Sequence, residues 1–473
     1  MGPAGVSRPG GSRPGGAVGD LIVVVPSISF PVVELQKITA VQSYEERMLF
    51  LLLLLADPTL RVVYVTSETV DPATIDYYLR FLPDPADARR RLDLVAVGDP
   101  SIGSLSAKFL ARPADLERLR AVVGDPAVGG GGMLPFNVTR AEQDLADALG
   151  LALYGPRPDL VWLGSKSGSR QVAKEAGVAV LAGAEDISSL GELAKAVAGL
   201  REARPDATAV VVKLNNGFSG QGNAIVELGG PAASLPLAPT VFCAAEESWS
   251  SFEAKIEDEG AIVEELVTSP GLRSPSVQLQ ISPAGEVEVL STHDQVLGGP
   301  QNQVYLGCSF PARPEYRAAI QAEAGKVAQV MVARGVTGVF GIDFLVDGGR
   351  VTLSEINLRM GGTTHPYWMA LLATGGSYDQ ASGELRLPGG GTRCYVATDN
   401  VKSLRLLGSH PADAIARIDE AGLAFDPSTA AGATLHLLGA LPGAGKMGVT
   451  CIAGTPEEAD DLYARVVAAL DAP

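Results

Sequence analysis

Two carboxylates, an amide and a guanidinium lie at short spacing in residues 338–366. Side chains alternate between the two faces of a strand, so Glu355, Asn357 and Arg359 share one face while the chain remains extended. If Asp343 pairs with Glu355 across a hairpin, the two carboxylates lie together, because directly opposed Cβ atoms are only ~4.5–5.5 Å apart. Such a pair repels unless a cation lies between its members, and oxygen ligands suit Mg²⁺. The spacing therefore predicts a magnesium site formed by Asp343, Glu355 and Asn357.

A β-hairpin would have to position these ligands. Strand-like runs at residues 339–346 and 351–357 flank Asp-Gly-Gly-Arg, and Asp-Gly or Gly-Gly between such runs is a strong hairpin signal. With Asp343 opposite Glu355, the loop comprises residues 348–350. An isolated motif of this kind is more often a solvated edge hairpin, by roughly three to one. The apolar strands around the acids and the polar segment that follows them favour a site instead.

The segment directly after the hairpin supplies further polar groups. It offers a cation, glycines, two hydroxyls and an imidazole at the mouth of the same site. A histidine beside a charged site is more often a hydrogen-bonding partner than an acid–base catalyst, so we assign no proton transfer to it. We expect substrate contacts from Arg359, Gly362, Thr363, Thr364 and His365.

A lysine followed by a glycine-rich loop is the second informative element. Residues 209–214 are typical of a strand, and the loop NNGFSGQGN follows at residues 215–223. Glycines let backbone N–H groups approach phosphate oxygens closely, and an ammonium group supplies a point charge. An ordinary turn with a surface lysine explains this element equally well when it is taken alone. A polyphosphate site here would use Lys213, Gly217, Ser219, Gly220 and Gly222.

Other segments are informative only in combination. Lys166 opens a short predicted helix, where a lone lysine is usually solvated. An apolar strand at residues 261–263 leads into a segment whose backbone could bind an adenine edge, although acidic strand ends mostly aid solubility. That segment is Glu264, Glu265, Leu266 and Val267. By contrast, GALPGAGKM at residues 439–447 is not a P-loop, because five residues rather than four separate its glycines and Met447 replaces the Ser or Thr that holds magnesium.

Composition excludes several classes of function. The 473 residues carry 37 Lys+Arg against 54 Asp+Glu, a net charge of −17, with no basic run that would favour nucleic acid or an anionic membrane. The most hydrophobic run, residues 48–56, is shorter than the ~20 residues that span a bilayer. A capping-box pattern at residues 43–46 precedes it, which predicts a buried helix. Four cysteines without a C-x-x-C pair indicate a reduced, cytoplasmic protein.

Alternating strands and helices in residues 20–163 predict a doubly wound α/β domain. Residues 1–19, rich in Gly, Pro, Arg and Ser, are expected to form a disordered leader. Residues 124–133 contain too many glycines for a conformation to be assigned. The expected strands are residues 21–25, 61–66, 92–97 and 159–163, and the expected helices are residues 43–56, 76–82 and 140–150.

Mostly antiparallel strands with helices on one side predict α+β organisation in the following residues. We expect a central subdomain, residues 164–268, and then a subdomain that carries the metal hairpin, residues 269–392. A C-terminal extension, residues 393–473, would either cap the site or form a subunit interface. The interface is the favoured alternative, and it would make the protein a homodimer.

Periodicity and caps predict the main elements of these subdomains. Within the central subdomain, a strand is expected at residues 178–181 and a helix at residues 189–204, with Asp186 or Ser188 as its cap. A long helix at residues 314–334 leads to the metal hairpin. The extension ends in an amphipathic helix at residues 456–470.

In their order along the chain, these elements resemble the ATP-grasp superfamily. The resemblance rests on four segments: GSKSGSRQVAKEAGV, VVVKLNNGFSGQGN, AIVEEL and GIDFLVDGGRVTLSEINLRMGG. It implies α/β plus α+β architecture, with an N-terminal doubly wound domain, two α+β subdomains that clamp ATP and a C-terminal extension. It also implies roles: Lys166 and Lys213 contact ATP phosphates, residues 264–267 line the adenine, Asp343, Glu355 and Asn357 hold Mg²⁺, and Arg359 steadies an acyl phosphate.

Within that superfamily, the chain resembles peptide ligases of antibiotic and other secondary-metabolite biosynthesis. This resemblance implies that a carboxylate, from a guanidino-bearing nonproteinogenic amino acid, is activated as an acyl phosphate. It is then joined to the N-terminal amine of a peptide, giving ADP and phosphate. Two alternatives keep the nucleotide site: a kinase of a small hydroxyl compound, and a nucleotide-binding module without turnover. The complete set of acids, amide and arginine argues against simple binding.

Overall fold

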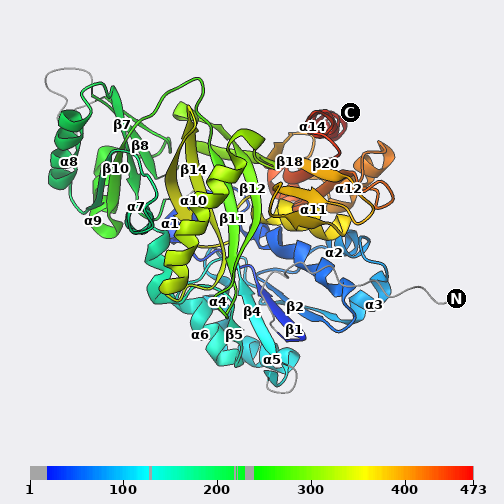
Figure 1. Cartoon of the computed structure of the whole chain (residues 1–473). Helices are drawn as coiled ribbons and strands as arrows, with labels where there is room; N and C mark the ends of the chain where they lie inside the picture. The colour runs from blue at the N-terminus through cyan, green and yellow to red at the C-terminus, as the bar shows by residue number, and fades with distance from the viewer. Residues whose placement is uncertain (1–18, 127–129, 218–219, 221, 229–238, 472–473) are drawn as a thin grey trace.

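The computed structural model describes residues 19–126, 130–217, 220, 222–228 and 239–471. The strands of these residues form a five-stranded parallel sheet, a five-stranded antiparallel sheet and a ten-stranded sheet. Figure 1 shows the antiparallel sheet, in green, beside the large sheet, with the blue and cyan parallel sheet below them. Among the described residues, no helix combines the length and apolar character needed to cross a membrane.

The first sheet confirms the doubly wound α/β domain. Its strands are parallel and follow the order β3-β2-β1-β4-β5. The apolar run LIVVV of β1 is buried throughout, as expected for a parallel strand that is covered on both faces. The strands are β1 (Leu21–Val25), β2 (Arg61–Thr66), β3 (Leu92–Ala96), β4 (Gly131–Pro135) and β5 (Ala152–Leu153). The helices are α1 (Val32–Leu35), α2 (Pro72–Leu79), α3 (Pro85–Arg90), α4 (Leu105–Leu110), α5 (Pro113–Val123) and α6 (Arg140–Leu149).

The fourth strand of this sheet is not the predicted one. Residues 159–163 lie in a 3₁₀ helix, η3 (Pro158–Gly164), which has proline at its first position. The strand is instead β4, which overlaps the unassigned glycine-rich region. Its first residue packs closely, because a Cβ on Gly131 would lie only 3.1 Å from Leu151 Cδ2. Glycine therefore permits the packing of β4 and also hides the strand from propensity arguments.

The predicted buried helix is present as η1 (Val41–Ala56), a 3₁₀ helix, but its capping box is not. Ala40 precedes the helix with a φ of 55° and no side-chain cap. Glu46 instead accepts a hydrogen bond from the backbone N–H of Gly439 at 2.9 Å, and Glu45 accepts one from the Ser67 hydroxyl at 2.7 Å. These acids therefore connect η1 to distant segments rather than stabilising its start.

The second sheet has the strand order β6-β10-β7-β8-β9, and its pairings are antiparallel. Its core cluster includes apolar residues of two helices, α8 (Leu190–Ala203) and α9 (Trp249–Glu259). The strands are β6 (Gly183–Ile187), β7 (Ala209–Leu214), β8 (Asn223–Glu227), β9 (Thr240–Phe242) and β10 (Ala261–Glu265).

Two predictions for this region were wrong. Residues 178–181 do not form a strand, and only an isolated bridge joins Val180 to Leu353. Helix α8 is capped by Ser189, whose side chain accepts from the Glu192 N–H, and not by Asp186 or Ser188. The Asp186 carboxylate accepts from Gln171, and the Ser188 hydroxyl donates to the Glu192 carboxylate.

The third sheet contains the predicted metal hairpin. Asp343 of β14 pairs with Glu355 of β15, which confirms that register. The loop is shorter than predicted, because Asp347 pairs with Arg350 and leaves only Gly348 and Gly349 between them. A bulge after Asp343 absorbs the extra residue. The strands are β11 (Pro275–Ile281), β12 (Val287–Gly298), β13 (Val304–Phe310), β14 (Gly338–Asp347), β15 (Arg350–Asn357), β16 (Ser377–Asp379), β17 (Glu384–Arg386), β18 (Thr392–Lys402), β19 (Gly432–His436) and β20 (Lys446–Ala453).

The C-terminal residues continue this sheet and contact the N-terminal domain. Strand β18 pairs with β13 and with β20, so the extension shares the sheet of the hairpin. One core cluster combines the leucines of η1 with apolar residues of the extension, and Figure 1 shows α2 beside α12 (Pro411–Glu420). The remaining helices are α7 (Lys166–Glu175), α10 (Pro314–Ala333), α11 (Thr364–Thr374), α12 (Pro411–Glu420), α13 (Leu441–Ala444), α14 (Pro456–Asp471), η4 (Pro300–Asn302) and η5 (Leu438–Ala440).

Candidate active site

A cavity of about 1140 Å³ lies where the three sheets meet. The N-terminal domain contributes Ile28 and Phe136, the antiparallel sheet contributes Val211 and Lys213, and the hairpin contributes Asp343. Because different parts of the chain form its walls, the cavity brings together groups that are far apart in sequence.

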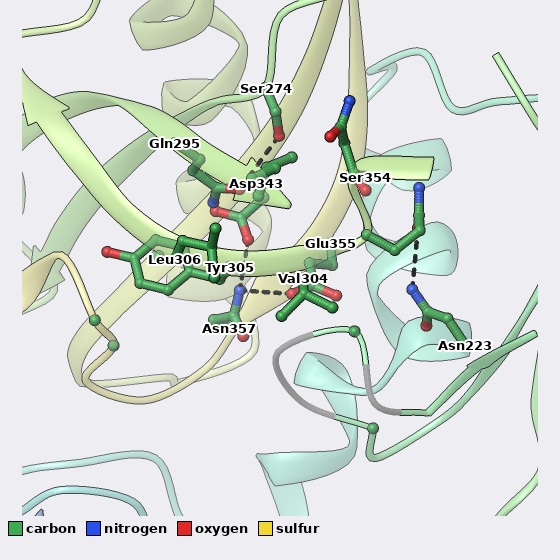
Figure 2. A pocket seen from close by; sticks show the side chains of 18 of the residues that line it. Asn223, Ser274, Gln295, Val304, Tyr305, Leu306, Asp343, Ser354, Glu355 and Asn357 are labelled. Carbon is green, nitrogen blue, oxygen red and sulfur yellow. Dashed lines mark hydrogen bonds between the residues drawn. The ribbon is translucent and has the colours of Figure 1, made fainter. Parts of the chain in front are cut away.

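The predicted acid pair lies in this cavity. The Asn357 Nδ2 donates to Asp343 Oδ2 and to Glu355 Oε1, both at 3.0 Å, so the amide bridges the two carboxylates (Figure 2). On the other side of the amide, Arg359 donates to Asn357 Oδ1 at 3.2 Å. The hairpin register and the alternation of side chains along β15 together place these four groups in contact.

The two acids differ in their affinity for protons. Burial and then the nearby charge of Glu355 raise the pKa of Asp343. Burial alone would raise the pKa of Glu355 as well, but the attraction of Lys166 outweighs it and lowers that pKa. The Lys166 ammonium lies 2.6 Å from Glu355 Oε2. The site therefore holds one charged carboxylate beside one that resists ionisation, and an added cation would relieve this conflict.

The donor set fits Mg²⁺. Two carboxylates face each other from paired strands and already share a positively polarised N–H group. Asp343 and Glu355 are hard oxygen donors, and Mg²⁺ takes few protein ligands of this kind and completes its shell with water and phosphate. The amide oxygen of Asn357 is a third hard donor, but it faces Arg359, so the amide would have to turn over to join the two acids. These three residues are therefore the ones that could hold the ion.

Lys213 is held in place by a buried carboxylate. Its Nζ lies 2.9 Å from Glu264 Oε2, while the other oxygen of Glu264 lies 2.6 Å from Arg170. Burial alone would lower the pKa of Lys213, but the attraction of Glu264 outweighs it and raises that pKa. Glu264 thus orients Lys213, and sequence reasoning missed this contact and the part that Arg170 plays in it.

The strand end predicted to line an adenine also borders the cavity. Glu265, Leu266 and Val267 are lining residues, together with Glu264. The Glu265 carboxylate is occupied, because it accepts from the Ala182 N–H at 3.2 Å and pairs with Arg204 at 2.5 Å. The side chains of both acids are therefore engaged with protein groups.

The glycine loop lies close to Lys166. The Lys166 Nζ donates to the Gly217 carbonyl at 2.9 Å, and both Gly217 and Gly220 line the cavity. Gly222 packs against Gly217, since a Cβ on Gly222 would lie 2.8 Å from the Gly217 Cα. Ser219, the remaining predicted contact, lies outside the described residues.

The predicted substrate contacts fall into two groups. Arg359, Gly362 and Thr363 line the cavity. Thr364 and His365 are not among its lining residues: the Thr364 hydroxyl donates to Gln278 at 3.0 Å, and His365 Nε2 lies 2.8 Å from the Nε2 of another histidine. Both side chains are buried and face protein groups.

His365 belongs to a buried cluster with Asp399 and His436. The Asp399 Oδ1 lies 3.3 Å from His365 Nε2 and 3.0 Å from His436 Nε2. Burial lowers the pKa of His365 to about 4, so its imidazole is neutral at physiological pH. Three such ligand atoms could hold a metal ion, yet the hydrogen bonds within the cluster already satisfy the atoms that face each other.

Cations from the two ends of the chain were not predicted to lie here. Arg47 of η1 pairs with Asp399 of β18 at 2.7 Å, and Lys446 of β20 bonds to the Tyr44 hydroxyl. All four residues line the cavity. No local sequence pattern predicts that these residues meet. The sequence around Lys446 indicated only that residues 439–447 are not a P-loop.

Two family models and two proteins are similar to this chain in sequence. A family model described as IQCH-like, ATP-grasp matches residues 236–354, and a model described as PGM1 C-terminal domain matches residues 413–466. The L-propargylglycine--L-glutamate ligase of Streptantibioticus cattleyicolor is 33% identical over 450 residues, which are 92% of this chain and 91% of that protein. The IQ motif-containing protein H of Danio rerio is 24% identical over 345 residues, which are 61% of this chain and 32% of that protein.

Solved structures share the fold. An ADP complex of N5-carboxyaminoimidazole ribonucleotide synthetase superposes with a TM-score of 0.56 at 14% identity, covering 96% of this chain and 97% of that one. A nucleotide complex of biotin carboxylase from Campylobacter jejuni gives a TM-score of 0.57 at 14% identity, covering 93% and 89%. At such low identity these likenesses show the arrangement of sheets and helices alone.

Proposed function

The chain belongs to the ATP-grasp ligases, and we propose that it activates an amino-acid carboxylate as an acyl phosphate and joins it to an amine. One observation carries this proposal: Asp343, Glu355 and Asn357 converge between two cations, Lys166 and Arg359, in a cavity shared by three sheets. Such a group of charges suits the transfer of a phosphoryl group to a carboxylate.

The reaction has two steps. A carboxylate is a poor electrophile, so one of its oxygens first attacks the γ-phosphorus of ATP, and the bond to the β-phosphate bridging oxygen breaks to release ADP. The amine then attacks the carbonyl carbon of the acyl phosphate, the C–O bond to phosphate breaks, and the amine loses a proton. The products are an amide, ADP and phosphate.

The roles of the chain's own residues follow from their positions. Lys213, oriented by Glu264, and Lys166, which contacts the glycine loop, bind phosphate oxygens. Arg359 steadies the acyl phosphate from beside Asn357. A magnesium ion held by Asp343, Glu355 and Asn357 would neutralise charge on the phosphate oxygens.

The rest of the cavity accommodates nucleotide and substrate. The strand end with Glu265, Leu266 and Val267 borders the adenine, and Gly217 and Gly220 lie beside the phosphates. Gly362 and Thr363 lie on the substrate side, where they contact the acid or the amine.

The substrates we propose are amino acids or short peptides in secondary metabolism. The name of the similar Streptantibioticus cattleyicolor ligase states that it joins L-propargylglycine and L-glutamate. The resemblance to peptide ligases suggests a guanidino-bearing acid and the N-terminal amine of a peptide. Both possibilities use the same chemistry, an activated carboxylate and a free amine.

Phosphate release from ATP tests this function directly. The purified chain is incubated with ATP, Mg²⁺ and pairs of carboxylate and amine compounds, and products are identified by mass. A ligase releases phosphate only when both partners are present and yields their condensed mass. A kinase would form ADP and a phosphorylated product with one partner alone. Either that result or absence of turnover across the screen would contradict the proposal.

A further inference from the structure

The wall of the cavity beyond Arg359 is formed by the two ends of the chain. Tyr44 and Arg47 come from η1, and Asp399 and Lys446 come from β18 and β20. All line the same cavity as the acid pair. Two of the four are cations: Arg47 pairs with the Asp399 carboxylate, whereas Lys446 bonds to the Tyr44 hydroxyl.

Lys446 is a buried cation whose bonding partner is a hydroxyl group. Only 6% of its surface is exposed. Its ammonium bonds to the Tyr44 hydroxyl, and within the described part of the chain no carboxylate lies within ion-pair distance of it. Removing an ammonium group from water is costly unless a charge partner compensates. An anion that enters the cavity would supply that partner.

Arg47 reinforces the positive charge at the same ring. Its guanidinium lies 4.2 Å from the centre of the Tyr44 ring, and the Lys446 ammonium lies 4.9 Å from it, so both cations contact one aromatic side chain. One Arg47 nitrogen pairs with Asp399, while its Nε is buried without a hydrogen-bond partner among the described residues. Arg47 therefore keeps donor capacity beyond its ion pair.

This wall and the reaction centre belong to one cavity. Arg359 contacts Asn357, and its guanidinium lies 5.5 Å from the Phe30 ring. Arg47, Lys446 and Asp399 line the same cavity as Arg359. On the far wall itself, Arg47 and Lys446 outnumber the single carboxylate of Asp399, so this wall has an excess of positive charge.

We infer that Lys446 and Arg47 bind a carboxylate of an amino-acid substrate that does not itself react. This subsite rests on the proposed function, because it gives the amino-acid substrate a second anchor beside the reaction centre. The reacting carboxylate would lie at Arg359, and the anchored one would be held away from ATP. The subsite would thus select amino acids over their amides and decide which carboxylate of a diacid is activated.

The same anchor could serve either partner of the reaction. A diacid such as glutamate would use it to hold one carboxylate while the other is activated. An amine substrate would use it to hold its α-carboxylate while its nitrogen attacks. Both uses need the same ligand chemistry, a carboxylate between a lysine and an arginine, and amidated probes separate them.

Calorimetric titration tests the subsite without any need for turnover. The probes are L-glutamate, its α-amide, its γ-amide, L-alanine and L-alaninamide, each added to the full chain in the presence of ADP and Mg²⁺. We expect the wild type to bind at least one acid more tightly than its amide. Lys446→Met should weaken binding of that acid by about 10- to 100-fold, the value of one charge-assisted hydrogen bond, and leave its amide and ADP unchanged.

Further variants keep the test decisive. Lys446→Arg retains the charge and should restore most of the affinity, and Lys326→Gln removes an exposed lysine of α10 as a control. If Lys446→Met does not fold, Tyr44→Phe removes the hydroxyl that bonds the ammonium while keeping the ring, and it should weaken the acid and spare the amide. Equal effects on acid and amide, or a wild type that binds acids and amides equally, would overturn the inference.

The pattern of binding also identifies the anchored substrate. Loss of affinity with the α- or γ-amide of glutamate assigns the anchor to a diacid, and loss with alaninamide assigns it to the amine. Binding that depends on Lys446 without any ligation product would contradict the proposed function alone. Ligation with an unchanged preference for acids in Lys446→Met would contradict this inference alone.

Discussion

The lysines at the two ends of the cavity differ in their partners. At the end that we propose for the nucleotide, called the nucleotide end below, Lys213 pairs with Glu264 and Lys166 pairs with Glu355. At the far end, Lys446 has a tyrosine hydroxyl and, within the described part of the chain, no carboxylate within ion-pair distance. The first pair of lysines is held in position before any ligand binds, whereas the far lysine keeps a charge that a ligand must neutralise.

This difference separates positioning from selection. A paired lysine has a fixed orientation, so it loses little freedom when a phosphate arrives. A buried lysine without a carboxylate partner raises the free energy of the empty site. Only a ligand of opposite charge compensates for this cost, so the lysine favours anionic ligands. The nucleotide end thus suits a ligand that every turnover shares, and the far end suits discrimination among substrates.

The largest effect should come from the acid pair. Asp343→Asn replaces a carboxyl ligand of the proposed magnesium ion by an amide and should lower ATP-dependent ligation by about 1000-fold, because metal-assisted charge stabilisation is worth several kcal/mol and ~1.4 kcal/mol is tenfold in rate. The measurement is the initial rate of phosphate release. Asp347→Asn, in the same strand, is the matched control, since Asp347 accepts from the Ser269 hydroxyl at 2.9 Å and does not line the cavity. Full activity in Asp343→Asn would remove the metal assignment.

The next effect should be on folding at the nucleotide end. Glu264 is 1% exposed and contacts both Lys213 and Arg170. Glu264→Gln leaves these two buried cations facing an uncharged amide and should lower the free energy of unfolding by ~3 kcal/mol. The measurement is urea denaturation at constant pH.

Glu265→Gln is the matched control for that variant. Its partner, Arg204, has a side chain that is 46% exposed and remains hydrated, and the glutamine can still accept from the Ala182 N–H, so the loss should be smaller, about 1 kcal/mol. Equal losses in the two variants would show that the Lys213–Glu264–Arg170 group is no stronger than a pair with one hydrated partner. In that case the orientation of Lys213 would need another cause.

The predictable part of the site is the part encoded by neighbouring residues. The register of Asp343 with Glu355 follows from alternation along two strands and a glycine turn, and Lys213 is placed by the strand that contains it. Arg47 and Lys446 meet only because β18 and β20 extend the hairpin sheet beneath η1. A single sequence carries no periodic signal for such contacts.

The mistaken elements have local causes. In β4, Gly131 permits close packing against Leu151, but Gly131 and Gly132 have little strand propensity, so sequence patterns do not predict this strand. In η3, the apolar residues 160–163 have the composition of a strand, yet proline at the first position favours a helical turn.

Glu46 is the reverse of Lys446: it is a buried acid, and among the residues that the structure describes no cation lies within ion-pair distance of it. Burial raises its pKa to about 7, although the Gly439 N–H bond opposes this. Because the folded protein holds this proton more tightly than the unfolded chain, the stability due to Glu46 is complete below the ordinary glutamate pKa of 4.5, falls as pH rises and is lost above about pH 7.

Glu46→Gln should therefore stabilise the protein only at higher pH. The amide can still accept from Gly439 and carries no charge to bury, so we expect a gain of ~1–2 kcal/mol at pH 8 and almost none at about pH 4.5. Thermal unfolding at both pH values provides the measurement. A gain that is the same at both would show that Glu46 is charged in the folded protein throughout this range.

The smallest effect should come from Lys446, and its sign is the sharpest test of the contrast. Lys446→Met removes an uncompensated buried charge and retains an unbranched side chain, so the free energy of unfolding should stay the same or rise by up to ~1 kcal/mol. Lys213→Met, the matched change at the paired end, should lower it, because the carboxylate of Glu264 would lose one of its two cations. If the two variants change the free energy of unfolding with opposite signs in urea denaturation, then only the far-end lysine lowers stability in return for ligand binding. A loss in Lys446→Met as large as that in Lys213→Met would mean that the Tyr44 bond suffices as a partner, and then no anion would be needed to explain why a lysine is buried there.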